Sequence, residues 1–248
     1  MYINAIGYHC ESEDNCFKSN IKQEIQFLEK TKSFCCNAIN RSLPYLHYDI
    51  ASIDTIVLMS EVRLNEIAFV LRQEYDLLNT KIIEISSNYT LVNTLELINI
   101  FFSLKLSHKA LLIYMGEESV AYFFSDEKIR TKEGRLIRIS HVLVEHKQSK
   151  SLYMSHIKSI LEMNGYFLSD LSYIIFNDSR NKVIKSAIAA LDIPKDKILE
   201  NADNSKNKDI EPFLTLAQNY EDFKANDLIY ISFFKESFLL GACLLEIS

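Results

Sequence analysis

Short runs of apolar and β-branched residues alternate along the chain with longer segments in which apolar residues recur every three or four positions. The short runs predict buried strands and the longer segments predict amphipathic helices. Strands are predicted at residues 2–8, 52–60, 81–86, 109–115, 119–125, 171–178, 227–234 and 237–248. Helices are predicted at residues 19–40, 64–75, 89–104, 152–163, 182–191 and 209–222. This alternation predicts an α/β protein with a mostly parallel sheet and right-handed crossovers.

The second half of the chain repeats the order of the first half. The segments IDTIVL, KIIEIS, ALLIY and VAYFF match LSYIIF, KILENA, DLIYI and GACLL, at an offset of about 115 to 121 residues. We therefore predict two similar βαβαβαββ halves, residues 1–140 and 141–248, which form a five-layered α-β-α-β-α unit. The last strand of each half is expected to be antiparallel. A single sheet without duplication is the alternative.

The boundary between the halves is placed in the charged segment 126–150. This segment surrounds an alternating stretch, RLIRISHVLVEH, and is expected to be an exposed crossover with one antiparallel edge strand.

Composition narrows the classes of function. The chain has 248 residues and only five glycines, and neither a G-x-G-x-x-G nor a P-loop motif is present, which argues against nucleotide binding of these kinds. A formal net charge of -6 argues against a nucleic-acid partner. Five cysteines without a C-x-x-C pair, and no H-E-x-x-H, predict neither a disulfide framework nor a metal site, and no cofactor is expected.

The start of the chain and its longest apolar runs also bear on location. MYINAIGYHCESEDN lacks a basic segment followed by a long apolar one, so it does not read as a signal peptide. The apolar runs are too short to span a bilayer. We expect a cytoplasmic protein with no membrane partner.

The order and spacing of these segments resemble a known family. The repeated order is similar to the thiolase fold, and the detailed match is closest to β-ketoacyl-acyl-carrier-protein synthase III. The opening MYINAIGYHC resembles the first strand of that family, and GEESVAYFF stands where the family has GDGAGAAVL. NGYFLSDLSYIIFND resembles the segment that leads to the family's HQAN motif, and the last two strands match with Gly241 on a family glycine. The resemblance covers nearly the whole chain.

The resemblance implies a cysteine nucleophile at the start of the helix that follows KIIEIS. A helix N-terminus lowers the pKa of a thiol and so favours the thiolate. In this chain the nucleophile position falls on Tyr89, or on Asn88 if one residue is deleted. Neither side chain can form an acyl thioester.

The other groups that the family uses are replaced as well. The histidine of HQAN, which stabilises the developing enolate, corresponds to Asn177. The family's active-site asparagine corresponds to Ser205, although a slip of one or two residues would bring Asn204 or Asn207 to that position. The glycine loop that supplies an oxyanion-hole N–H reads Lys-Glu-Ser at 235–237. Together these changes predict that the chain does not catalyse condensation.

The resemblance therefore implies a non-catalytic subunit that pairs with a catalytically complete synthase III-like protein, as a heterodimer or a dimer of heterodimers. The chain would be similar to the inactive small subunit of heterodimeric alkylquinolone synthase and to chain-length factors. Acyl-CoA or acyl carrier protein would be bound through the partner. Two alternatives stay open: an acyltransferase of this fold with a different nucleophile or direct transfer, and a stand-alone acyl-binding homodimer.

The predicted helix 89–104 supports this pairing, because it is apolar on more than one face. A helix of this kind must be buried on all sides. In the family this helix and the KIIEIS strand lie at the dimer interface, so interface positions are expected at Leu91, Leu95, Ile98 and Phe102.

Overall fold

We describe the protein from a computed structural model. The structure describes residues 1–10, 21–46, 48–60, 65–77, 79–86, 91–115, 118–129, 137–146, 150–178, 181–200, 211–234 and 239–248.

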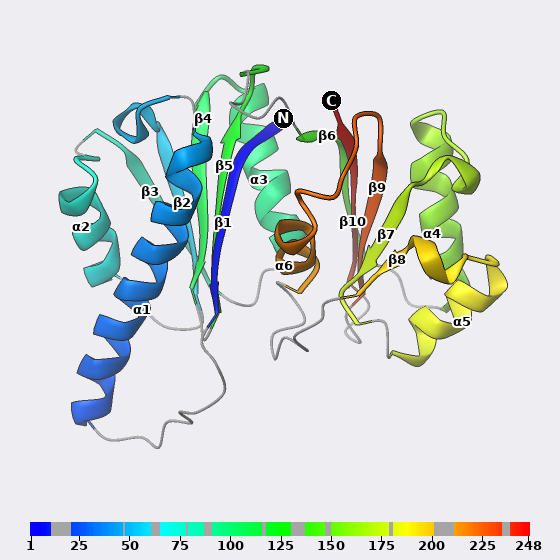
Figure 1. The fold of residues 1–248 in the computed structure, drawn as a ribbon, viewed down its shortest axis with the longest axis horizontal. Helices are drawn as coiled ribbons and strands as arrows, with labels where there is room; N and C mark the ends of the chain where they lie inside the picture. The colour runs from blue at the N-terminus through cyan, green and yellow to red at the C-terminus, as the bar shows by residue number, and fades with distance from the viewer. Residues whose placement is uncertain are drawn as a thin grey trace. The chain divides into compact units, whose positions relative to one another are not determined.

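Strands and helices alternate as the hydrophobic pattern predicts (Figure 1). The elements before residue 130 are β1 (Tyr2–Cys10), α1 (Ile21–Ser42), β2 (Thr55–Ser60), α2 (Asn65–Glu74), β3 (Lys81–Ser86), α3 (Leu91–Ser103), β4 (Lys109–Met115) and β5 (Glu118–Ser125). The later elements are β6 (Ile137–His146), α4 (Lys150–Met163), β7 (Tyr173–Phe176), α5 (Lys182–Ala190), β8 (Ile198–Leu199), α6 (Glu211–Gln218), β9 (Leu228–Phe234) and β10 (Leu239–Ile247). Both series read βαβαβαββ.

The chain forms two compact units. One comprises Met1–Tyr89 and Ile100–Gly134, and the other comprises Thr90–Asn99 and Arg135–Ser248. Helix α3 therefore contributes its first part to the second unit and its last part to the first unit. The sequence-based boundary at residue 140 falls inside β6, which lies wholly within the second unit.

The two units have the same strand order. In the first unit the order is β3-β2-β4-β5-β1, with β2 parallel to β3 and β4, and with β5 antiparallel to β4 and β1. In the second unit the order is β8-β7-β9-β10-β6, with β7 parallel to β8 and β9, and with β10 antiparallel to β9 and β6. If the strands of each unit are numbered along the chain, both orders read 3-2-4-5-1. This identity confirms the predicted repeat and its antiparallel final hairpin.

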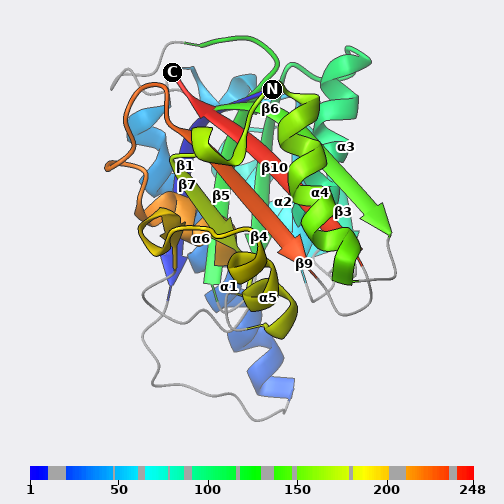
Figure 2. The same ribbon diagram turned by 90° about the vertical axis from the view of Figure 1, so that its right-hand side faces the viewer.

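The cores of the two units are also equivalent, residue by residue. In the first unit α1 and α2 cover one face of the sheet, and in the second unit α4 and α5 do the same (Figures 1 and 2). The strand residues that meet these helices occupy matching positions of the matched segments. They are Ile56, Leu58, Leu111, Ile113, Ala121 and Phe123 in the first unit, and Ile174, Phe176, Leu228, Tyr230, Ala242 and Leu244 in the second.

One sequence-based expectation is corrected. The stretch 137–146 was expected to be an antiparallel edge strand in an exposed crossover. The antiparallel pairing is confirmed, with β10 as the neighbour, but β6 is the first strand of the second unit's repeat, and its Ile137 and Ile139 are buried. The alternation of apolar and charged residues reflects one buried face rather than exposure of the whole segment.

Helix α3 begins very close to β10. A Cβ atom on Gly241 would lie 3.2 Å from the Cβ and both γ-methyl carbons of Val92. Val92 is fully buried, so it has little room to move away. Glycine at this position therefore allows the start of α3 to rest against the strand.

We expect Gly241→Ala to lower the free energy of unfolding by about 1–3 kcal/mol, because the added methyl group overpacks this contact. Val92→Ala should remove most of that penalty in the double variant, as measured by urea denaturation. Gly165→Ala is the control. Gly165 has φ +77° and open space around it, so its penalty comes from backbone strain and should not respond to residue 92. Strict additivity of Gly241→Ala and Val92→Ala would contradict the proposed contact.

Candidate functional site around Asn177

Asn177 immediately follows β7 and is 2% exposed. Its Nδ2 donates to the backbone oxygen of Phe234 at 3.1 Å, and its Oδ1 accepts from the backbone N–H of Phe234 at 2.9 Å. Its own N–H donates to the backbone oxygen of Ser232 at 3.1 Å. The amide side chain thus extends the β7–β9 ladder by one more pair of hydrogen bonds.

This arrangement restricts what Asn177 can do chemically. A carboxamide carries no charge at any ordinary pH, and here one N–H and one oxygen lone pair are already committed to Phe234. The side chain can neither take up a proton nor supply a positive charge to a developing enolate. Its geometry is that of a structural clamp on the end of β9.

A buried polar pair lies beside the clamp. The hydroxyl of Tyr153 on α4 lies 2.6 Å from Ser232 Oγ, and both side chains are fully buried. The Tyr153 ring also packs on Phe234, with 5.5 Å between ring centroids. Burial raises the pKa of Tyr153, so its hydroxyl stays protonated and is not a base. These contacts hold β9 in place as Asn177 does.

The other sequence-predicted positions lie outside the described residues. These are Asn88, Tyr89, Ser205 and the segment 235–237, together with Asn204 and Asn207. The described part of α3 begins at Leu91. The structure shows that the start of this helix lies against Gly241, but it does not describe the residues just before Leu91.

No cysteine whose side chain the structure describes is an activated nucleophile. Cys35 and Cys243 are fully buried, and burial raises the pKa of each thiol well above its ordinary value. Cys36 is half-buried, and burial is also the main reason that its pKa is raised. A raised pKa keeps the thiol protonated, whereas nucleophilic catalysis requires thiolate.

Three of the four predicted interface residues are buried by the chain itself. Leu95, Ile98 and Phe102 are fully or nearly fully buried, and nothing is described for the side chain of Leu91. These three side chains are satisfied without a partner, so the apolar character of α3 by itself no longer argues for one.

A different surface of the first unit carries unpartnered apolar residues. Strand β3 ends the sheet and pairs only with β2 among the described strands. Four of the six large apolar side chains exposed in the described ranges lie on α2, near the end of α3, or in the turn after it: Phe69, Ile100, Leu104 and Leu106. Lys81 of β3 links this turn to the strand, since its Nζ donates to the backbone oxygen of Leu106 at 3.2 Å. Period-2 alternation is weak in KIIEIS, so its local pattern does not mark it as an edge strand.

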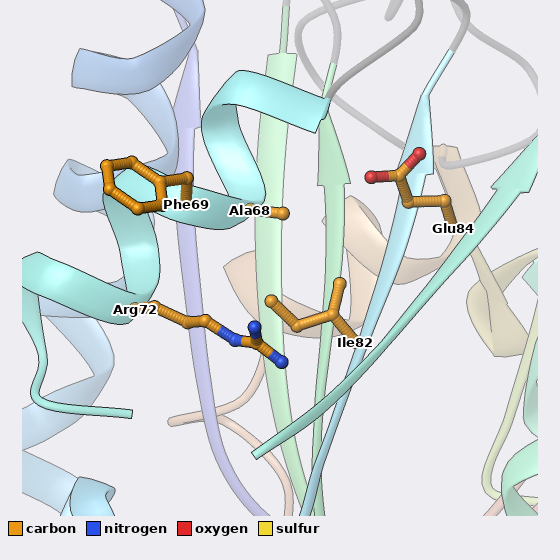
Figure 3. A pocket seen from close by; sticks show the side chains of 5 residues that line it. All are labelled: Ala68, Phe69, Arg72, Ile82 and Glu84. Atoms are coloured by element: carbon orange, nitrogen blue, oxygen red, sulfur yellow. The ribbon is translucent and has the colours of Figure 1, made fainter. Parts of the chain in front are cut away.

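A pocket of about 580 Å³ lies between α2 and β3 on this surface. Its lining comes from both elements: Ala68, Phe69, Arg72, Ile82 and Glu84 (Figure 3). The guanidinium of Arg72 points towards Ile82, and its Nη2 donates to the backbone oxygen of Thr80 at 2.8 Å. Its Nε is buried and has no hydrogen-bond partner among the described residues. The pocket is thus lined by one cation, one anion and three apolar side chains, and polar and apolar atoms contribute equally to its surface.

Within the described part of the chain, no three His, Cys, Asp or Glu side chains are grouped so that they could hold a metal ion. None of the helices described there is long and apolar enough to cross a bilayer.

No protein-family model matches the sequence, and no curated protein is detectably similar to it. Solved structures are similar over the whole chain. The 3-oxoacyl-[acyl-carrier-protein] synthase III of Aquifex aeolicus has a TM-score of 0.76 and 14% identity, with 99% of each chain covered. The FabH synthase III of Pseudomonas aeruginosa has a TM-score of 0.73 and 12% identity, and covers 100% of this chain and 99% of its own. OleA of Xanthomonas campestris has a TM-score of 0.68 and 9% identity, and covers 99% of this chain and 97% of its own.

The chain has the thiolase-like fold. At identities of 9–14%, similarity to these structures establishes the fold alone. The chemistry of this chain has to be argued from its own residues. The fold predicted from sequence is therefore confirmed.

Asn177→Asp tests the clamp. The carboxylate would face the backbone oxygen of Phe234, so burial and repulsion should raise the pKa of the introduced Asp above its unfolded value of about 4. Below about pH 4 the protonated acid can still donate to that oxygen, and this stabilisation should be lost as the pH rises through the raised folded pKa. We expect a deficit of about 2 kcal/mol or more at pH 7, measured by urea denaturation across pH.

Asn181→Asp is the matched control, because Asn181 caps α5 and its Oδ1 accepts from the Val183 N–H at 2.8 Å. A carboxylate is a good acceptor at a helix N-terminus, so this variant should cost little at pH 7. Equal, pH-independent effects of the two changes would show that the amide of Asn177 is not committed to Phe234.

Proposed function

We propose that this chain is a non-catalytic, ketosynthase III-like subunit that pairs with a catalytically complete synthase III-like protein in acyl condensation. The partner would bind the acyl-CoA or acyl carrier protein and carry out the chemistry. The solved structures with this fold include synthases that are named for 3-oxoacyl-[acyl-carrier-protein] formation, which supports the choice of reaction class.

The observation that carries the proposal is the double hydrogen bond between Asn177 and the backbone of Phe234. Asn177 stands at the position where the family has a histidine. Its side chain is neutral, and its amide group stabilises the end of β9. Replacement of the nucleophile position by Tyr89 or Asn88, and of the family asparagine by Ser205, is part of the same proposal. A chain that keeps the fold and gives up these groups is best suited to supporting an active neighbour.

The open edge of β3 supports the pairing. An unpaired strand edge presents backbone donors and acceptors that another chain can satisfy, and natural proteins normally protect such edges. Ile82, Ile83 and Ile85 are half-buried on this strand, and the exposed Phe69 lines the pocket beside it. We place the partner on the open edge of β3 and on Phe69.

The isolated chain should form no covalent acyl intermediate. After incubation with radiolabelled acyl-CoA and denaturation, no label should stay on the protein, because the described thiols are protonated and position 89 or 88 is not a cysteine. An intact 3-oxoacyl synthase III, treated in parallel, should be labelled. Stable label on any residue of this chain would favour instead an acyltransferase with a different nucleophile.

Co-expression with an intact synthase III-like protein from the same source should yield a complex with equal numbers of the two chains, by light scattering of the co-purified material. Ile83→Lys on the open edge should lower the yield of complex, because it places a charge among apolar contacts. Thr215→Ser, a conservative change on buried α6, is the control and should leave the yield unchanged. Failure of every intact synthase tested to co-purify, with both chains folded, would contradict the subunit proposal.

A further inference from the structure

The pocket between α2 and β3 carries opposite charges at two levels of one strand face. Successive residues of a strand point to opposite faces. Ile82 and Glu84 both line the pocket, so they share the face of β3 that is turned to α2. Being two residues apart, they are separated by about 6.6 Å along the strand. The guanidinium of Arg72 points towards Ile82, so the cation stands at one of these levels and the anion at the other (Figure 3).

Arg72 is held in position by the chain but is not neutralised by it. Its backbone oxygen accepts from the N–H of Leu77 at 2.9 Å, and its Nη2 donates to the backbone oxygen of Thr80 at 2.8 Å. Among the described residues Arg72 has no ion pair, and its buried Nε has no hydrogen-bond partner. A guanidinium has several N–H donors, and Thr80 takes one of them. The cation is therefore positioned in advance and keeps donors for an anion that enters the pocket.

Glu84 presents its carboxylate to the same pocket from a rigid strand. The whole of β3 pairs with β2, from Lys81 opposite Thr55 to Ser86 opposite Ser60. Glu84 is exposed, and no ion pair of its carboxylate is found in the described part of the chain. The Nζ of Lys81 on this strand is directed elsewhere, since it donates to the backbone oxygen of Leu106 at 3.2 Å. The carboxylate is thus available to the cation of a ligand.

Apolar side chains complete the lining. Ala68 and Ile82 line the pocket together with Phe69, which is 62% exposed. The volume of about 580 Å³ lies within the range of about 300–1,000 Å³ that is common for small-molecule sites. The pocket therefore suits a small ligand that has a charge at each end and an apolar body between them.

We propose that this pocket binds a linear zwitterion of the ω-amino acid class, with its carboxylate on Arg72, its ammonium group on Glu84 and its methylene chain against Ile82 and Phe69. Guanidinium and carboxylate form strong charge-assisted hydrogen bonds. The ligand needs a spacer between its charges, because the levels of Ile82 and Glu84 are about 6.6 Å apart. In an α-amino acid both charged groups are on the same carbon atom, so it is too short. A ligand with one charge would leave either Arg72 or Glu84 without a partner.

This inference goes beyond the proposed function, because it requires neither a synthase nor acyl chemistry. The synthase partner is proposed to lie on Phe69 as well, so ligand and partner would share this residue. Binding is therefore measured on the isolated full chain. Its failure would leave co-purification with a synthase untouched, so the two proposals fail distinguishably.

The first test is a series of ligands that differ in length and in charge, followed by NMR titration. We expect ε-aminocaproate to bind with a dissociation constant of about 1 mM or lower. Glycine should bind about tenfold or more weakly, with γ-aminobutyrate in between, because their charges are closer together. Caproate lacks the ammonium group and should bind about two- to fivefold more weakly. Hexylamine lacks the carboxylate and should lose about tenfold or more.

Variants of the pocket then assign each charge of the ligand to its residue. Glu84→Gln should weaken ε-aminocaproate about two- to fivefold and leave caproate unchanged, because caproate has no ammonium group. Arg72→Met should weaken ε-aminocaproate and caproate by about tenfold and leave hexylamine unchanged. Phe69→Ala should weaken all three ligands, because each has a methylene chain. A merely structural effect of these changes would not depend on which charge the ligand carries.

Glu162→Gln and Phe167→Ala are the matched controls, since both residues are exposed in the second unit, and neither change should affect binding. Because Arg72 bonds Thr80, circular dichroism must show that Arg72→Met is folded; Glu84→Gln, at an exposed residue, tests the proposal even if it is not. The proposal would be overturned by absence of binding at about 10 mM ε-aminocaproate. Glycine or caproate binding as tightly as ε-aminocaproate, or Glu84→Gln weakening caproate equally, would overturn it too.

Discussion

Each half of this protein is organised by the requirement that alternate residues of three neighbouring strands bury one face under two helices. In the first unit these strands are β2, β4 and β5, and in the second they are β7, β9 and β10. The same positions of matched segments meet the helices in both units. The other set of alternate residues in these strands is buried as well, which is typical of strands in the middle of an α/β sheet.

The site at Asn177 follows from this constraint. The residue stands where β7 ends, next to β9, and its amide continues the hydrogen bonding of the sheet after the strand itself has stopped. An amide that pairs with backbone stabilises the strand end, and it cannot also serve as a charged donor.

The edge of β3 is the second consequence. In the strand order of the first unit the third strand, β3, lies at an end, where one row of its backbone groups has no strand to pair with among the described residues. This chain does not protect the edge with proline or with charges that all repel. It places three isoleucines on the strand, and the exposed Phe69 lines the pocket beside it together with Arg72 and Glu84.

The sequence by itself determined the elements, the repeat and the fold. Buried strands and amphipathic helices are encoded by local periodicity, and the offset between matched segments shows that the order occurs twice. The sequence also indicated that residue 177 is not a histidine, which is enough to question catalysis.

Only the tertiary structure decided what Asn177 does, because its hydrogen-bond partner is 57 residues away and no local pattern reveals that pairing. Tertiary packing likewise decided that Leu95, Ile98 and Phe102 are buried by the chain itself. An apolar helix face looks the same in a sequence whether its own chain or a partner covers it. The pocket that joins Arg72 to Glu84 depends on α2 lying against β3, and burial of the segment 137–146 depends on pairing with β10. Each of these outcomes is a contact between residues distant in sequence, and such contacts are set by the packing of the whole fold rather than by local periodicity.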